Sequence, residues 1–238
     1  MRRMAIPLLC LLLSSDVSAQ VLNAREVGDR LRTSTGNELK QLLEQLDLPP
    51  KIVDEYSANY IGGFHWFYLN SRSGTSLNAL ALPCASISGA PIFLLERSNG
   101  RWHLRDREGM DCHYDDSANV QLAGLTSRKQ YDLLLHHDCQ GRGTGYVEQH
   151  TRVLRIVGTH FKQVLDREDV VHAFPPGGTG TSEESTFLPT SLNTLEQTRE
   201  ANIYDSNYQP IMSRISISRR TFHWDGRRFV ASSWQRLR

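Results

Sequence analysis

The chain has 238 residues, and its 27 Lys and Arg nearly balance its 26 Asp and Glu. A chain so close to neutral has no overall field that would steer it toward nucleic acid or an anionic membrane, so we expect neither kind of partner. Its length suffices for one domain with a sizeable core or for two small domains. The basic residues are mostly arginine, a bias that suggests a GC-rich bacterial genome.

The N-terminus has the three parts of a secretory signal peptide. Arg2 and Arg3 form a charged start, residues 5–13 form a short apolar core, and the small residues before Gln20 fit cleavage after Ala19. The apolar run is too short to span a bilayer, and no later segment is apolar enough to do so. We therefore expect a signal peptide over 1–19 and an exported protein, located in the periplasm or the medium.

Residues 20–60 are predicted to be helical. Four leucines recur at the spacing of one helix face, Leu39, Leu42, Leu43 and Leu46. Thr35 and Glu38 have the spacing of a capping box, and the pair Pro49–Pro50 ends the helix. The segment either packs on the main domain or forms an amphipathic helix that docks a partner.

From residue 61 to 238 the pattern changes to that of antiparallel strands. Apolar side chains alternate with polar ones, as at Phe64, Trp66 and Tyr68, which is typical of a strand with one buried face. Asn99-Gly100 and Asp225-Gly226 are signals of two-residue hairpin turns, and Gly158 serves a similar bend. The expected fold class is mainly β, with an N-terminal helical segment.

Three segments repeat a similar hairpin, which suggests three imperfect units near 63–106, 119–167 and 185–236. Repeats of this size predict stacked or radially arranged sheets, either propeller-like or a sandwich. The strand order and hairpin turns faintly resemble the blades of secreted bacterial FG-GAP and VCBS-type proteins. The calcium loop of those blades is absent, and three units are too few for a closed propeller. The resemblance therefore implies a β-repeat fold and no activity.

Two polar segments rich in turn residues, 174–187 and 199–213, are predicted as long loops. Long loops in compact domains often carry function. They are candidates for partner contact, or else tolerated insertions.

Removal of the leader leaves Cys84, Cys112 and Cys139. In an oxidising compartment two of them are expected to pair, and all three pairings are open from the sequence. We favour Cys112 with Cys139, because each follows an aspartate in a polar loop next to a strand. A structural zinc site is not expected, since no C-x-x-C pair occurs.

The stretch 131–150 contains His136, His137, Asp138, Cys139 and His150 within twenty residues. A cysteine hydrolase would need a base beside the thiol and an orienting third group, and these residues supply both types. The flanking segments, however, are predicted strands, whereas known cysteine nucleophiles usually lie at helix N-termini. We expect a strand hairpin and assign no catalytic residue. The glycine-rich loop lacks the lysine and helix of a phosphate-binding loop, so no cofactor is expected.

An acidic segment over 106–116 has oxygen ligands that calcium accepts, but its spacing matches no EF-hand loop. We therefore interpret it as solvated and predict no metal site. The four tryptophans, Trp66, Trp102, Trp224 and Trp234, are interpreted as core residues, although they could instead form a sugar-stacking platform.

The C-terminal unit interleaves arginines with aromatic residues. We select Arg219, Arg220, Arg227 and Arg228 as candidate contacts for an acidic protein partner. The predicted function is non-catalytic binding of a macromolecule, in particular a protein, for example as an inhibitor or immunity protein against a secreted enzyme. The alternatives are a Cys/His hydrolase and a glycan-binding module of the envelope. The oligomeric state is left open.

Overall fold

The computed structural model describes residues 22–59, 63–72, 75–85, 89–110, 118–127, 131–140, 146–174 and 178–238. The predicted signal peptide therefore lies outside the described residues. Within them, no helix is both long and apolar enough to cross a membrane.

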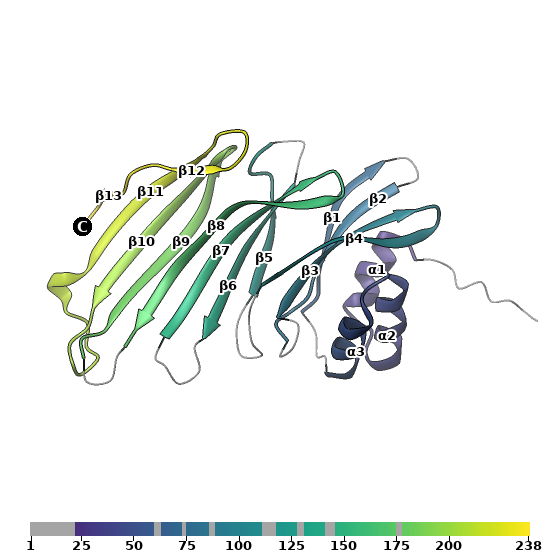
Figure 1. Cartoon of the computed structure of the whole chain (residues 1–238), viewed down its shortest axis with the longest axis horizontal. Helices are drawn as coiled ribbons and strands as arrows, with labels where there is room; N and C mark the ends of the chain where they lie inside the picture. Colours follow the sequence, from purple (N-terminus) through teal and green to yellow (C-terminus); the bar gives the residue numbers. More distant parts are fainter. Residues whose placement is uncertain are drawn as a thin grey trace, which may run out of the picture.

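Three short helices occupy the predicted helical segment: α1 (Ala24–Leu31), α2 (Gly36–Gln45) and α3 (Pro50–Asn59). The predicted apolar face of α2 is buried. Pro50 is the first residue of α3, a position where the missing N–H costs nothing because no helical carbonyl would accept it. The three helices pack side by side against one sheet at one end of the molecule (Figure 1).

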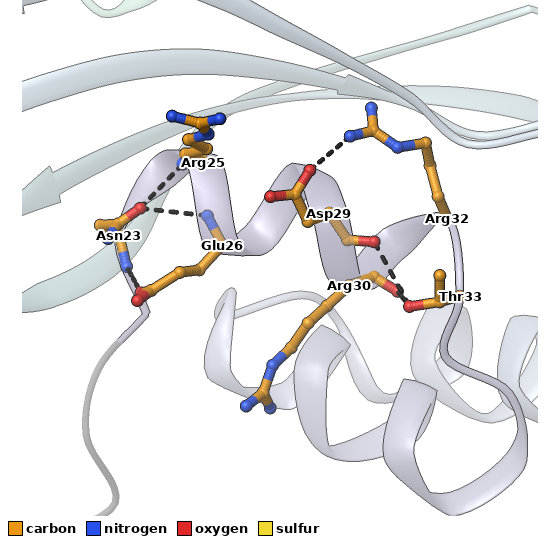
Figure 2. A network of polar contacts seen from close by, with 7 residues as sticks. All are labelled: Asn23, Arg25, Glu26, Asp29, Arg30, Arg32 and Thr33. Carbon is orange, nitrogen blue, oxygen red and sulfur yellow. Dashed lines mark hydrogen bonds and ion pairs between the residues drawn. The ribbon is translucent and has the colours of Figure 1, made fainter.

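The capping box lies at α1 and not at α2. Thr35 is the N-cap of α2, but its side chain makes no capping hydrogen bond, so the predicted capping box at Thr35 and Glu38 is wrong. At α1, Asn23 accepts hydrogen bonds from the backbone N–H groups of Arg25 and Glu26, and Glu26 accepts one from the N–H of Asn23 (Figure 2). Asparagine with glutamate three residues later meets the same chemical need as threonine with glutamate.

The first sheet has four antiparallel strands in sequence order: β1 (His65–Arg72), β2 (Thr75–Ala81), β3 (Ala90–Ser98) and β4 (Arg101–Met110). Alternate side chains of its strands serve different cores. Leu80 and Phe93 face the helices, whereas Ala79 and Leu94 face the second sheet. Burial on both faces explains why β3 begins with a continuous apolar run.

Within the described residues, the second sheet has nine antiparallel strands. They are β5 (Ala118–Ala123), β6 (Asp132–Gln140), β7 (Tyr146–Val157), β8 (His160–Ala173), β9 (Thr181–Ser191), β10 (Thr194–Ile203), β11 (Ser216–Trp224), β12 (Phe229–Ala231) and β13 (Gln235–Arg236). Strands β5 to β12 follow one another across the sheet, and β13 pairs with β11 beside β12 (Figure 1). A single turn of 3-10 helix, Met212–Arg214, precedes β11.

The second sheet curls strongly, so that side chains from distant strands meet on one face. His136 on β6 and Phe187 on β9 have ring centroids 6.4 Å apart, although two strands lie between them. In a flat sheet these strands would be about 14 Å apart, since neighbours are spaced by about 4.8 Å. We call this side the concave face. Its core contains Leu134, Val153, Leu165, Phe187, Leu195, Phe222 and Phe229.

The other face of β6 and β7 packs on the first sheet. Leu133, Leu135 and Leu154 meet Ala79 and Leu94 in a separate buried cluster. The chain is thus layered as helices, first sheet and curled second sheet, which confirms the mainly β class with helices near the N-terminus. The first predicted unit, 63–106, corresponds to the first sheet, while the second and third units join in the curled sheet.

Candidate functional site

A row of alternating arginines and aromatic rings lies on the concave face. The guanidinium carbons of Arg167 and Arg220 lie 5.9 and 4.8 Å from the centroid of the Phe222 ring. The guanidinium carbons of Arg220 and Arg199 each lie 4.3 Å from the Trp234 ring. The arginine row, defined as these three arginines with Phe222 and Trp234, draws on β8, β10, β11 and the segment before β13.

Strand register explains why the row forms. Leu195, Gln197 and Arg199 are alternate residues of β10, and they pair with β11 in a register that places Gln197 opposite Arg220. Alternate residues of a strand share a face, so these side chains follow the buried Leu195 onto the concave face. Arg167 follows Leu165 along β8 in the same way.

Hydrogen bonds hold the arginines in place. The Nε of Arg220 donates to the Oε1 of Gln197 at 2.6 Å, and the amide of Gln197 donates to the hydroxyl of Ser185 at 2.8 Å. Arg199 donates to the carboxylate of Glu183 at 3.2 Å. Gln197 is only 2% exposed, so the position of Arg220 is fixed by a buried partner.

This arrangement suits anion recognition. A guanidinium group stacks its flat face on an aromatic ring while its N–H donors point outward around the rim. Those donors match the two oxygens of a carboxylate. Glu183 balances part of the charge at Arg199, whereas Arg167 forms no ion pair with any described residue. Three guanidinium groups on adjoining rings therefore concentrate positive charge on one face of a nearly neutral chain.

A cavity of about 520 Å³ opens beside this row. Residues 163–167 of β8 line one side, and residues 228–231, which include β12, line the other. Leu165 and Phe229 supply apolar surface, Arg167 and Arg228 supply positive charge, and the negative charge of Asp166 is paired with Arg152 at 3.5 Å. Neither Arg167 nor Arg228 forms an ion pair within the described part of the chain. The volume falls in the range of small ligand or peptide-segment sites.

Asp132 is fully buried on β6, near the turn between β9 and β10. Its carboxylate accepts hydrogen bonds from the backbone N–H groups of Leu125 and Thr126 at 2.9 and 2.8 Å. The carbonyl of Leu125 in turn accepts from the N–H of Asn193 at 2.6 Å, which ties this segment to the turn between β9 and β10. Burial raises the pKa of Asp132, while the hydrogen bonds from residues 125 and 126 act in the opposite direction.

The four arginines predicted as partner contacts do not share one surface. Arg220 belongs to the arginine row, and Arg228 lines the cavity. Arg219 lies on the opposite face of β11, where it pairs with Glu196 at 3.6 Å. Arg227 is exposed in the turn whose N–H groups are capped by Asp225.

Arg199 and Arg167 were not predicted from the sequence. The alternation of side chains along a strand could have placed Arg219 and Arg220 on opposite faces of β11. It could not have shown that β8 and β10 bring two further arginines onto the same face, because that follows from the curl of the sheet.

The predicted hairpin over 131–150 is formed by β6 and β7. His136 lies on the concave face with its Nδ1 2.8 Å from the Thr151 hydroxyl. His150 is on the outer face, 3.9 Å from Asp166. The structure therefore does not bring these two histidines together. The side chains of His137, Asp138 and Cys139 lie outside those that the structure describes.

The other sequence candidates have structural explanations where they are described. Asp106 of the acidic segment accepts a hydrogen bond from the N–H of Phe161 at 2.7 Å, joining β4 to β8. Residues 111–117 lie outside the described residues. Among those described, no group of three or more His, Cys, Asp or Glu could hold a metal ion.

The cysteines are only partly described. Cys84 packs against the cluster between the two sheets and is disulfide-bonded. That bond needs a second cysteine. Cys112 and the side chain of Cys139 lie outside the described part of the chain, so their predicted pairing stays a prediction, in competition with a bond from either of them to Cys84.

The tryptophans divide into two groups. Trp66 and Trp102 contact each other edge to face at 5.5 Å in the core under the helices, and Trp224 packs on the core of the concave face. Trp234 is instead covered by two arginines, so the interpretation as core holds for three of the four.

Much of the predicted loop sequence is strand. Residues 181–187 belong to β9 and 199–203 to β10, because Ser, Thr and Glu on those strands pair regularly with their neighbours. The remaining parts meet through aromatic contacts: Phe174 lies 5.1 Å from Tyr204 and 5.8 Å from Tyr208. Partner contact at these segments stays a prediction.

Comparisons with known proteins give no relative from which a function could be transferred. No family model matches the chain, and neither a curated protein nor a solved structure matches it.

Proposed function

We propose that this chain is an exported, non-catalytic binding protein that recognises an acidic segment of a protein partner on its concave face. The observation that carries the proposal is the arginine row, in which three guanidinium groups are stacked on two rings within one curved surface. Stacked and hydrogen-bonded arginines are pre-organised, so little conformational entropy is lost when a carboxylate binds.

Two further features support a binding role over catalysis. The row is backed by a buried glutamine, whose side-chain oxygen accepts a hydrogen bond from Arg220 and fixes its position. The neighbouring cavity combines apolar and cationic walls, which suits a segment that alternates apolar and acidic residues. A bacterial inhibitor or immunity protein against a secreted enzyme is one form of such a function.

The experiment measures calorimetric binding of a short synthetic peptide of alternating valine and glutamate, with its valine–lysine counterpart as the charge control. We expect the glutamate peptide to bind and the lysine peptide not to bind. Arg220→Gln should weaken binding at least tenfold, since a hydrogen bond to a charged group contributes about 1.5–3 kcal/mol.

The matched control is Arg219→Gln, a neighbouring arginine on the opposite face of the same strand. It should leave the affinity unchanged. Equal effects of the two substitutions, or equal binding of both peptides, would reject the arginine row as the recognition surface. Thermal unfolding of both variants verifies that they are folded.

A further inference from the structure

Strand β8 has an edge that is largely unpaired within the curled sheet. It pairs with β7 from His160 to Ala173. On its other side it pairs with β9 at only three positions, Val171, His172 and Ala173. The sheet therefore splits between β8 and β9, and the earlier part of β8 has no strand partner on that side among the described strands.

The cavity lies along this split. Five consecutive residues of β8, 163–167, line it. Val164 is an extra residue in β8, because Leu154 pairs with Gln163 and Val153 with Leu165, and both Val164 and Leu165 enter the concave core. Gln163 and Asp166 instead contact Arg152 on the outer face. A lining that includes residues from both faces means that the edge of the strand borders the cavity. The same holds for 228–231 on the far side. Strand β12 is also an edge, because among the described strands it pairs only with β11, over three residues.

One end of the β8 edge is already capped. The N–H of Phe161 donates to the carboxylate of Asp106 at 2.7 Å. This N–H is therefore satisfied by a side chain and not by a neighbouring strand. Beyond it, residues 163–167 face the cavity. Unpaired strand edges are templates for an added strand, and an extended peptide supplies the missing backbone hydrogen bonds.

The side chains around the cavity define which peptide fits. Leu165, Phe229 and Ala231 belong to or pack on the core of the concave face, so they favour an apolar side chain pointing inward. Arg167 and Arg228 flank the same space, and the carboxylate of Asp166, which also lines it, is paired with Arg152. An extended segment places alternate side chains on opposite sides, so apolar residues can enter the core while acidic residues between them reach the arginines.

We propose that the partner segment binds as an added β-strand along residues 163–167 of β8, between β8 and β12. The inference rests on the proposed function for the acidic character of the segment and adds the mode of binding. The ligand class is an extended peptide that alternates aliphatic and acidic residues, and backbone hydrogen bonds to β8 provide much of its affinity.

The test compares the valine–glutamate peptide with the same peptide N-methylated at every second residue. Two such peptides are needed, one methylated at the valines and one at the glutamates. Methylation removes N–H donors and keeps every side-chain charge. An added strand donates toward β8 from alternate residues only, so we expect one methylated peptide to lose binding at least tenfold and the other to lose less.

Hydrogen exchange of the full chain locates the contact. Amides within 163–167 should become protected on addition of the unmodified peptide, whereas amides of β1, at the edge of the first sheet, should not change. Unaltered binding of both methylated peptides would overturn strand addition and leave charge recognition intact. Protection at β1 instead of β8 would overturn the assigned edge. If methylation weakens peptide binding but Arg220→Gln does not, strand addition is upheld and the arginine row is rejected as the recognition surface.

Discussion

The two faces of β6 and β7 show how one sheet is used in two ways. On the outer face, Leu133, Leu135 and Leu154 meet the first sheet in an apolar interface that excludes water. On the concave face, Leu134 and Val153 belong to a core that continues into arginines, a buried glutamine and a cavity. The outer face is covered by another sheet, whereas the concave face is filled only by side chains of its own sheet.

The difference shows that curvature decides how completely a face is filled. The first sheet covers the outer face of β6 and β7 with apolar side chains of its own. The concave face must be filled by its own side chains, and where β8 separates from β9 they do not reach across. Stability should therefore depend chiefly on the outer face, and binding on the concave one.

The largest expected effect is at the closed interface. Leu94 is fully buried between the two sheets. Leu94→Ala should lower the free energy of unfolding by about 2–5 kcal/mol, the usual cost of removing a buried leucine side chain. Urea unfolding measures it, and peptide affinity should not change in the folded fraction.

Leu188→Ala is the control for this substitution, because Leu188 lies on a strand of the second sheet but is 55% exposed. Its cost should stay below about 1 kcal/mol. If both substitutions cost the same, the outer face is not the closed interface described above.

Asp132, near the turn between β9 and β10, comes next. Asp132→Ala leaves the N–H groups of Leu125 and Thr126 without their acceptor, which should cost about 1–3 kcal/mol for each buried donor that finds no water. Thermal or urea unfolding at neutral pH measures this loss. A cost near zero would mean that water replaces the carboxylate.

Asp132→Asn separates hydrogen bonding from charge. The amide oxygen can still accept from the two N–H groups, but the side chain no longer titrates. Burial raises the folded-state pKa of Asp132 above 3.8, so above that pH the folded protein binds more protons than the unfolded chain. The native protein should therefore lose stability relative to Asp132→Asn as the pH rises from 3.8 through the folded pKa. Unfolding temperatures of both proteins from pH 3 to 7 measure this difference, and parallel curves would contradict it.

The smallest effect is expected on the exposed side of β11. The pair of Arg219 with Glu196 is partly exposed, at 42% and 28% of the two side chains. Its loss in Arg219→Gln should cost less than about 1 kcal/mol, as exposed ion pairs generally do. A larger loss in urea unfolding would show that this face is covered in solution.

Local features of the fold could be predicted from the sequence. The alternation after Tyr131 indicates strand β6, and the turns at Asn99-Gly100 and Gly158 have the positive φ that their residue types allow. The apolar face of α2 follows from leucine spacing alone. These features depend on neighbours within a few residues. The position of the capping box could not be predicted in this way. Asn23 and Thr35 are both acceptable N-cap residues, and the capping box forms only at Asn23.

The candidate site could be predicted only in part. Arg220 and Arg228 were selected from their local density, and alternation could have set Arg219 apart. Arg199 and Arg167 join the row because the sheet curls, and curl arises from twist accumulated over several strands. The split between β8 and β9 depends on where pairing stops, which no short sequence pattern records.

The two arginines stacked on Trp234 also provide a spectroscopic signal. The fluorescence emission of an indole ring responds to nearby charge, and two guanidinium groups lie on the ring of Trp234. Trp66 and Trp102 belong to a different core, the one between the helices and the first sheet. A carboxylate that draws the guanidinium groups away from the ring should change the emission of Trp234. Trp224 also lies near the cavity, with its ring 5.5 Å from that of Phe229. The unlabelled protein thus carries its own optical sensor of occupancy, and Trp234→Phe identifies the signal.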